Sequence, residues 1–569
     1  MYKLYFSLLL ILFSNGVASA QLSDRGGLIV RKAHQQDSSF GSSGFASPLS
    51  PAEERYNAIN PTLESVRTLY ANPSFSHLHN MEDTAHSHRT ALVYTGMSGA
   101  DGKGDFVPYE GDGFSDYRIG AYGEYTMPHS GTLSGCIQYA KGKHRNIGWS
   151  AMRLPELYYP YISTDSCGGD FKFDGYYAEG NYGFALSQCT LGIKGSFYGE
   201  QAYRLTDPRA LNNTTWLRFD IGAARQQNGH LLMIDAGYGR NKQHMQLRYW
   251  RPGQQDRFFV CYGFGLYDTR QSAVSFGKSR MYYVDEYRAR IQYQSPRNRR
   301  LQLHASLDYA YDRMETEESD IYNLYESGTH RFSPLLHLTY TPSSDWTCEV
   351  ISTADISLRK GYENIIEEYL IDKENNVYDF RTIDTRQNYS RNISQIMSAL
   401  RFSRRLGMVE LSMQVGVVGN GYEERYKAGN HRIKVQTLTP CVEAGMQCKG
   451  RKDEIGIGLG YARQGVGTHH YEVNMQNSQI AHLDFQQAFS PYAYRCAKLD
   501  KIHAEITWRH QLSRMVIGVN GKISMEKGHR LDDVRYTDVI GFTSTASMIS
   551  PLPDTHEERW GSVTIFVQF

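Results

Sequence analysis

The chain has 569 residues, 61 basic and 60 acidic side chains, a formal net charge of +1 and a mean hydropathy of −0.52. Charges this evenly balanced give no electrostatic footprint for nucleic acid, so we expect no nucleic-acid partner. The 42 tyrosines and 24 phenylalanines are many for so polar a chain. Aromatic rings in such numbers are typical of proteins that place them at two membrane interfaces.

The first 20 residues predict a secretory signal peptide. Lys3 precedes an apolar run from Leu4 to Phe13, and Ala18-Ser19-Ala20 then provide a cleavage site before Gln21. This order of a charged, an apolar and a small-residue region is that of a signal peptide, and the apolar run is too short to span a bilayer. A buried N-terminal helix is the alternative interpretation.

After residue 20 the sequence has no stretch of about 18 apolar residues, which excludes a helical membrane protein. If the protein spans a membrane, a closed β-barrel is then the one possible architecture, because every backbone polar group within the membrane must find a hydrogen-bond partner within the protein. From about residue 86, apolar and polar side chains alternate in short segments, as in LQLHASLDYAY at 301–311 and VELSMQVGV at 409–417. A period of two indicates β-strands with one apolar face. The polar side chains that would face the lumen carry both signs of charge and include Arg218, Asp220, His304, Asp308, Glu410, Glu454, Glu505, Arg509, Lys522 and Glu526.

Short and long connections alternate between these segments. Tight joins such as Asn228-Gly229 and Leu406-Gly407 alternate with long polar stretches near 143–171, 357–389, 468–490 and 529–557. The pattern predicts an all-β fold, a transmembrane antiparallel β-barrel with an even number of strands between 16 and 20, short periplasmic turns and long extracellular loops. For residues 230–268 the pattern is compatible with either two or three strands. A soluble β-sandwich or propeller is the alternative, but it would not need so many interface aromatics.

The chain ends in WGSVTIFVQF, in which Val563, Ile565, Val567 and the terminal Phe569 fall on one face of a strand. This ending resembles the C-terminal signal by which the barrel-assembly machinery recognises outer-membrane barrels. The expected partners are therefore this machinery and outer-membrane lipid.

The mature chain resembles a family of uncharacterised outer-membrane barrels of Bacteroidota, a domain of unknown function. The leader, the run LYANPS at 69–74, the loop LPELYYPYISTDSCGGD at 154–170 and the terminal strand carry the resemblance. It implies a barrel in the outer membrane of a Gram-negative cell and no activity. We divide the chain into a signal peptide (1–20), a polar N-terminal segment that is periplasmic or luminal (21–85) and the outer-membrane barrel (86–569).

The loop at 154–170 is unusually apolar for a segment between strands. An exposed loop of this composition would be costly in water, so we expect it to fold inward as a constriction or to contact a ligand. Packing of the loop on itself is the alternative. The candidate residues are Leu154, Leu157, Tyr158, Tyr159 and Tyr161.

Two other groups of residues could hold metal ions, but we expect no metal and no cofactor. An acidic cluster could bind calcium, although Lys103 within it favours a solvated loop; it comprises Asp101, Asp105, Glu110, Asp112 and Asp116. Three histidine pairs lack further ligands at tetrahedral spacing; they are His77/His79, His86/His88 and His469/His470.

The motifs G-x-S-x-G, H-E-x-x-H and G-x-x-x-x-G-K-[ST] are absent, so no catalytic residue is assigned and no enzyme is expected. The favoured function is a porin-like channel that passes an unknown solute. A surface-binding or secretion-associated barrel with a protein partner is the alternative, and a membrane-embedded hydrolase is less favoured. A plugged transporter of about 22 strands is not expected, because residues 21–85 are too few for a folded plug domain.

Overall fold

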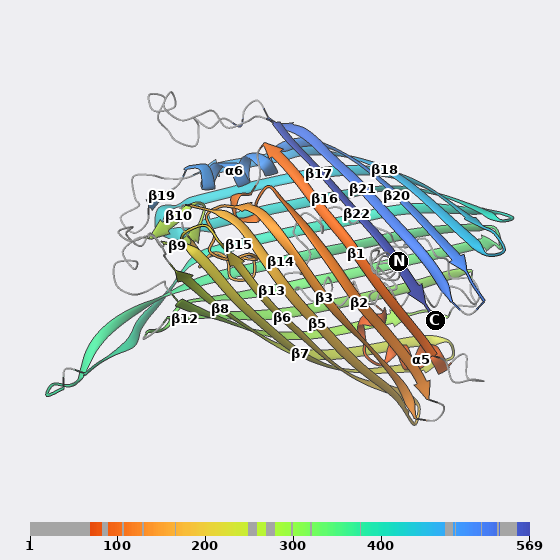
Figure 1. The fold of residues 1–569 in the computed structure, drawn as a ribbon, viewed down its shortest axis with the longest axis horizontal. Coiled ribbons are helices and arrows are strands. Elements are labelled where there is room, and N and C mark those ends of the chain that lie inside the picture. Colours follow the sequence, from red (N-terminus) through yellow and green to blue (C-terminus); the bar gives the residue numbers. More distant parts are fainter. Residues whose placement is uncertain are drawn as a thin grey trace, which may run out of the picture.

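In the computed structural model, the chain forms a closed antiparallel barrel of 18 strands (Figure 1). The structure describes residues 69–81, 89–104, 107–127, 130–164, 167–248, 259–268, 279–296, 300–318, 321–375, 377–472, 482–483, 485–513, 515–531, 534 and 555–569. The barrel strands are β1 (Arg89–Gly104), β2 (Gly113–Met127), β3 (Gly131–Ile147), β5 (Gly169–Leu186), β6 (Cys189–Arg204), β7 (Arg209–Gln227), β8 (His230–Arg248), β11 (Ser279–Gln294), β12 (Leu301–Glu318), β13 (Ile321–Ser343), β14 (Trp346–Asp372), β15 (Val377–Leu406), β16 (Val409–Tyr426), β17 (His431–Lys449), β18 (Asp453–Glu472), β20 (Ala497–Gln511), β21 (Val516–Arg530) and β22 (Thr555–Gln568).

The barrel closes where its last strand meets its first. β22 pairs antiparallel with β1, with Val567 opposite Val93 and Gly561 opposite Gly99. Closure removes the two open edges that a sheet of this size would otherwise present, so every strand has a partner on both sides. The even count of 18 confirms the expected range and differs from the roughly 22 strands of plugged transporters.

Apolar side chains cover the outside of the barrel, and polar ones fill the inside. Ile137, Phe219 and Ile523 are 64%, 63% and 65% exposed, whereas Arg218, next to Phe219 along β7, is 5% exposed. This arrangement is the reverse of that in a water-soluble protein and is the one expected when the barrel is surrounded by the hydrocarbon core of a bilayer. The barrel is an outer-membrane protein.

Two regions differ in detail from the expectation. Of the described residues in 230–268, only those of β8 belong to the barrel, because the strands that follow β8 are too short to cross and lie outside the barrel sheet. Part of the polar stretch 357–389, expected as a loop, is strand: β14 continues to Asp372 and β15 begins at Val377. Pairing with the neighbouring strands ends earlier, at Glu363 of β14 for β13 and at Tyr389 of β15 for β16. The hairpin therefore projects alone into water (Figure 1), which explains its polarity.

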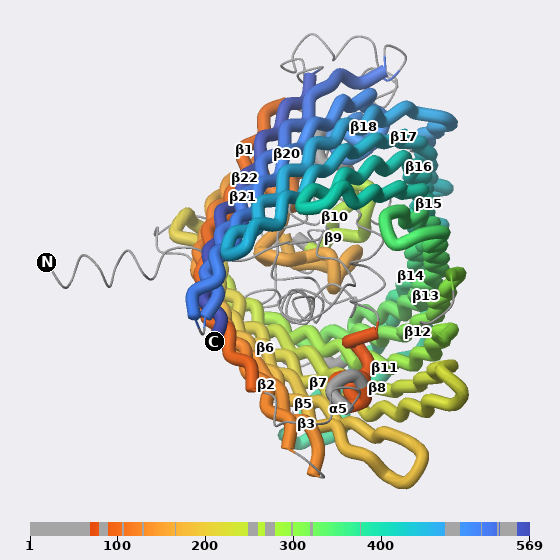
Figure 2. Tube along the Cα trace, turned by 90° about the vertical axis from the view of Figure 1, so that its right-hand side faces the viewer, coloured from red at the N-terminus to blue at the C-terminus, as the bar shows by residue number. Residues whose placement is uncertain are grey.

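Short elements from the extracellular loops form a second sheet, in the order β19-β10-β9-β4. Figure 2 shows β9 and β10 within the outline of the barrel wall, and α5 inside the wall, where it contacts β3, β5 and β6. No helix among the described residues is long and apolar enough to cross a membrane. The short elements are α5 (Phe75–Met81), η1 (Pro108–Glu110), β4 (Ser163–Thr164), β9 (Phe259–Gly263), β10 (Leu266–Asp268), η3 (Lys427–Gly429), β19 (His482–Leu483) and α6 (Phe485–Arg495).

Candidate functional site

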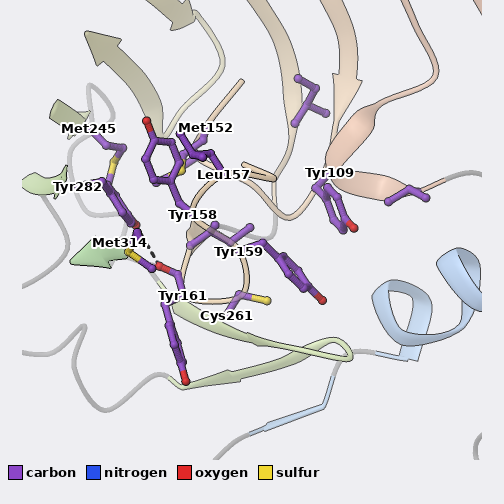
Figure 3. Close-up of a cluster of buried hydrophobic side chains, with 14 of the residues drawn as sticks. Tyr109, Met152, Leu157, Tyr158, Tyr159, Tyr161, Met245, Cys261, Tyr282 and Met314 are labelled. Carbon is purple, nitrogen blue, oxygen red and sulfur yellow. Dashed lines mark hydrogen bonds between the residues drawn. The ribbon is translucent and has the colours of Figure 1, made fainter. Parts of the chain in front are cut away.

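The loop between β3 and β5 crosses the lumen from wall to wall. We call its residues 148–164 the crossing loop. The Tyr158 hydroxyl donates to Asn241 Oδ1 at 2.7 Å on β8, and the Tyr159 hydroxyl donates to Glu424 Oε1 at 2.8 Å on β16. Five barrel strands separate β8 from β16 along the wall. The two adjacent tyrosine side chains point in different directions (Figure 3) and thus bind two separate parts of the barrel.

The backbone of the crossing loop is also held by the wall. Arg359 on β14 donates through Nη1 to the carbonyl oxygens of Glu156 and Tyr159, at 2.7 and 2.8 Å. On β11, the Tyr282 hydroxyl donates to the Tyr161 carbonyl at 3.3 Å (dashed in Figure 3). Carbonyl groups of an irregular segment would be costly to bury unpaired, and these donors satisfy them.

Of the five residues singled out in this loop, four are buried and one is not. Leu157, Tyr158, Tyr159 and Tyr161 belong to the largest buried cluster of the described residues, whereas Leu154 is half-buried and lies outside it. Burial raises the pKa of the three tyrosines well above the usual tyrosine value, so their hydroxyls remain protonated donors.

Glu156 is the exposed residue of this loop and faces inward. About half of its side chain is accessible, and it forms an ion pair with Arg391 on β15. Because it lies deep within the barrel, burial acts to raise the pKa of its carboxyl. The positive charges of Arg391 and Arg359 outweigh that effect and hold the pKa below its usual value. Glu156 therefore stays ionised.

Beside the crossing loop, one part of the lumen is filled by ion pairs. Arg218 on β7 donates to both oxygens of Glu286 on β11, at 2.5 and 2.7 Å. On the same wall of β7, β11 and β12, Asp220 pairs with Arg288 and Asp308 pairs with Arg290, so this part of the interior is a packed polar core. Other residues expected to face inward form ion pairs elsewhere around the wall: Glu410 with Arg405, Glu454 with Arg509, Lys522 with Glu505 and Glu526 with Lys501.

A cavity of about 750 Å³ lies against the remaining wall, which is formed mainly by β13 to β18 and β20. Glu156 and Leu157 of the crossing loop line it, as do Tyr494 and Arg495 of α6. Its wall carries amides and hydroxyls as well as charged groups. The cavity is therefore bounded in part by segments that come from the extracellular loops.

At the periplasmic end, residues 69–81 lie on the inner wall; we call them the N-terminal segment. Asn72 Nδ2 donates to the Ile234 carbonyl at 2.9 Å, and Lys194 Nζ donates to the Ala71 carbonyl at 3.4 Å. Leu69, Tyr70 and Phe75 pack in a small apolar cluster with wall residues of β7 and β8. The run LYANPS therefore lies in contact with the barrel interior.

Three glycines on adjacent strands make room for this segment. A Cβ at Gly192 would lie 2.3 Å from Pro73 C, one at Gly222 would lie 2.6 Å from Asn72 Oδ1, and one at Gly183 would lie 2.9 Å from His77 Cβ. Only glycine allows so close an approach of one backbone to another. The wall of β5, β6 and β7 is thus shaped to accept residues 72–77.

The other candidate residues make local contacts. In the acidic cluster, Asp101 binds Arg145 at 2.6 Å and Asp112 binds Asn146 at 2.9 Å; Asp105 lies outside the described residues. His77 Nδ1 lies 3.0 Å from Thr132 Oγ1 and His469 Nδ1 lies 2.8 Å from the Tyr492 hydroxyl. The side chains of His79, His86 and His88 are not among those described. Within the described ranges, no three His, Cys, Asp or Glu residues are grouped to hold a metal.

The terminal residues complete the seam of the barrel. Phe569 N donates to the Ala91 carbonyl at 2.9 Å, and Ala91 N donates to the Phe569 carbonyl at 3.3 Å. Val563 and Phe569 are 47% and 60% exposed, and Ile565 and Val567 are half-buried. The last residue thus closes the hydrogen-bond ladder between β22 and β1.

Sequence reasoning singled out residues of the crossing loop as candidates but not the wall residues that hold this loop. Asn241 is 83 residues from Tyr158, and Glu424 is 265 residues from Tyr159. No local pattern marks such partners. The available signal was the presence of amides, carboxylates and arginines at inward-facing strand positions.

The model of a family of unknown function (DUF6850) matches residues 84–544, most of the chain. The chain belongs to this family. No protein of curated function is significantly similar to it.

Among solved structures, the barrel is similar to three metal-related transporters, each at 9% identity. The copper transporter OprC has a TM-score of 0.36 over 83% of this chain and 81% of that chain. The ferric citrate transporter FecA gives 0.41 over 83% and 78%, and the FrpB iron transporter from Neisseria meningitidis gives 0.40 over 86% and 83%. Similarity at this level assigns no solute to the present chain.

Proposed function

We propose that this barrel passes a small solute across the outer membrane, through a lumen that its own segments gate. The observation that carries the proposal is the cavity of about 750 Å³, bounded by the crossing loop within a barrel of 18 strands. A barrel of this strand number has a bore wide enough for a channel unless something occupies it. Here the occupants are segments of the same chain.

Both occupants are held by contacts that can be broken without unfolding the wall. The crossing loop depends on hydrogen bonds from Tyr158, Tyr159 and Arg359, and the N-terminal segment depends on Asn72 and a small apolar cluster. Each barrel strand, in contrast, is hydrogen-bonded to a neighbouring strand on both sides. Displacement of the segments is therefore far less costly than any opening of the wall.

The proposal includes the finer expectations from the sequence. We take residues 1–20 as a signal peptide, the terminal strand with Phe569 as the signal for the barrel-assembly machinery, and a member of the Gram-negative Bacteroidota as the source. A ligand contact of Leu154, Leu157, Tyr158, Tyr159 and Tyr161 stays a prediction, supported by the presence of Leu157 in the cavity lining.

A second candidate, surface binding of a protein partner, is favoured by the projecting hairpin. Ile371, Val377 and Tyr378 near its tip are 58%, 46% and 52% exposed, and neighbouring strands do not extend to them. Exposed apolar groups on a two-stranded hairpin are typical of interaction sites. Loss of a partner from cells that carry a deletion of residues 364–388, with the barrel intact, would support this candidate.

Conductance in a planar bilayer tests the passage of solute. We compare the full chain with variants that lack residues 155–161, residues 21–81 or both. The double deletion should give stable conductance well above that of the full chain, because it removes the N-terminal segment and the central part of the crossing loop from the lumen. A matched control deletes residues 372–378, seven residues at the tip of the hairpin outside the lumen, and should conduct like the full chain. A folded double-deletion barrel that never conducts contradicts the proposal.

A further inference from the structure

We propose that the cavity beside the crossing loop binds an uncharged, polyhydroxylated solute such as a short oligosaccharide. This inference rests on the proposed function, since it names the class of solute that would pass. The cavity volume of about 750 Å³ lies within the range of about 300–1,000 Å³ that is common for small-molecule sites.

The lining has no excess of either charge. Four carboxylates are balanced by four cations, so the formal charge of the lining is zero with histidine neutral. A site for a simple ion generally presents a ring of one sign, which is not the case here. The eight charged residues are Glu156, Asp312, Asp355, Glu443, Arg331, Arg359, Arg495 and Lys501.

The four cations are already bound to oxygen atoms of the protein. Two of them, Arg331 and Lys501, are paired with the carboxylates of Asp312 and Glu526, so an anion would compete with these carboxylates, whereas a neutral solute leaves all of the contacts intact. The contacts are Arg331 to both Asp312 oxygens at 2.7 Å, Arg359 to the Glu156 and Tyr159 carbonyls at 2.7 and 2.8 Å, Arg495 to the Pro491 carbonyl at 2.8 Å and Lys501 to Glu526.

A row of neutral hydrogen-bonding groups runs across the wall of the cavity. Gln395 Nε2 donates to Asn420 Oδ1 at 3.0 Å, and Asn420 Nδ2 donates to Thr437 Oγ1 at 3.3 Å. These residues lie on the neighbouring strands β15, β16 and β17. Amides and hydroxyls both donate and accept, as the hydroxyls of a sugar do. Further groups of this kind in the lining are Gln414, Gln464, Thr439, Ser333, Ser357, Ser394 and Ser524.

Apolar side chains lie between these polar groups. Ile393, Met397 and Val418 line the same part of the cavity on β15 and β16, and Tyr422 lies next along the inward face of β16. Sugar rings carry C–H faces as well as hydroxyls, so a wall that mixes apolar and neutral polar groups suits them better than it suits a strongly hydrated ion.

Isothermal titration calorimetry on the full chain in detergent tests this proposal. The neutral probes are maltotriose and raffinose, with trialanine as a zwitterion and citrate as an anion for comparison. We expect a neutral sugar to bind more tightly than trialanine or citrate. Gln395→Ala and Asn420→Ala should each weaken binding by roughly 3- to 10-fold, the usual effect of one lost neutral hydrogen bond. Gln447→Ala is the matched control, because this amide also lies on a barrel strand, β17, but not in the cavity lining.

Tighter binding of trialanine or citrate than of either sugar would overturn the proposal, as would the absence of sugar binding in the millimolar range. Equal weakening by Gln447→Ala and Asn420→Ala would also overturn it. Failure of this proposal and failure of solute passage are distinguishable. If the barrel conducts but binds no sugar, only the proposed class of solute is wrong. If it binds sugar but never conducts, the proposed sugar site stands and the proposed passage of solute is wrong.

Discussion

Replacement of Gly192 by alanine should release the N-terminal segment from the barrel wall. The new Cβ would lie 2.3 and 2.4 Å from the Pro73 carbonyl carbon and oxygen, and 2.4 Å from Ser74 N. These are backbone atoms, so no side-chain rotation relieves the overlap. β6 is hydrogen-bonded to β5 and β7 on its two sides, so the segment moves more readily than the strand. Overpacking of this kind costs about 1–3 kcal/mol, which corresponds to a rise of roughly 5- to 150-fold in the released population.

Chymotrypsin cleavage measures that population. Tyr70 and Phe75 are 3% and 2% exposed in the docked segment, so cleavage after either residue requires release. When the segment rebinds faster than it is cut, the cleavage rate follows the released fraction. The matched control is Gly180→Ala on β5, where a Cβ would meet no atom within 4 Å. Equal cleavage of the Gly192→Ala variant, the Gly180→Ala variant and the parent chain would refute the reasoning.

Three further predictions follow from the docked segments and the seam. Burial lowers the pKa of His77 from its usual value of 6.5, so the released segment takes up a proton at a higher pH than the docked segment does. Docking should therefore weaken as pH falls from about 7.5 to about 5.5, seen as faster cleavage after Phe75 than in a His77→Gln variant at the same pH; parallel pH profiles would contradict this. Tyr159→Phe removes a 2.8 Å hydrogen bond to Glu424, which keeps two other tyrosine donors at 2.6 and 2.9 Å. The crossing loop should lose about 1.5 kcal/mol of stability, near the low end for a hydrogen bond to a charged acceptor, and its backbone amides should exchange hydrogen roughly tenfold faster. Unchanged exchange would show that the Tyr159 hydroxyl does not hold the loop. Deletion of Phe569 removes both terminal hydrogen bonds to Ala91 and should lower the fraction of heat-modifiable barrel in the outer membrane relative to Gln568→Asn; equal assembly of the two variants would argue against an assembly signal.

The barrel was predictable from sequence because lipid imposes a local rule on each strand. Leu301 and Leu307 alternate with inward polar residues over a single segment, and both are exposed on the outside at 55% and 46%. The same rule failed for residues 357–389, because their polarity reflects projection into water and not the end of a strand. Alternation reports what surrounds a strand, and a strand beyond the membrane has water on both faces.

The contents of the lumen were less accessible to sequence reasoning. Composition alone identified the crossing loop, since Tyr158, Tyr159 and Tyr161 are costly to expose. The close approach of the N-terminal segment to Gly192 and Gly222 could not be predicted from the sequence, because a glycine within a strand has several possible roles. For residues 230–268 the sequence was compatible with two or three strands, and it gave no sign that β9 and β10 pair with each other and with other loops instead of with the barrel.

Closure of the cavity from the outside by the crossing loop is tested most directly by the reactivity of Cys441, a native thiol in the cavity lining. Intact cells are treated with a membrane-impermeant maleimide, and modification is followed at each cysteine by mass spectrometry. Modification of Cys441 should be slow in the full chain and much faster when residues 155–161 are deleted, while the exposed Cys167 reacts at a similar rate in both. Equal, rapid modification of Cys441 in both chains would show that the crossing loop does not close the lumen.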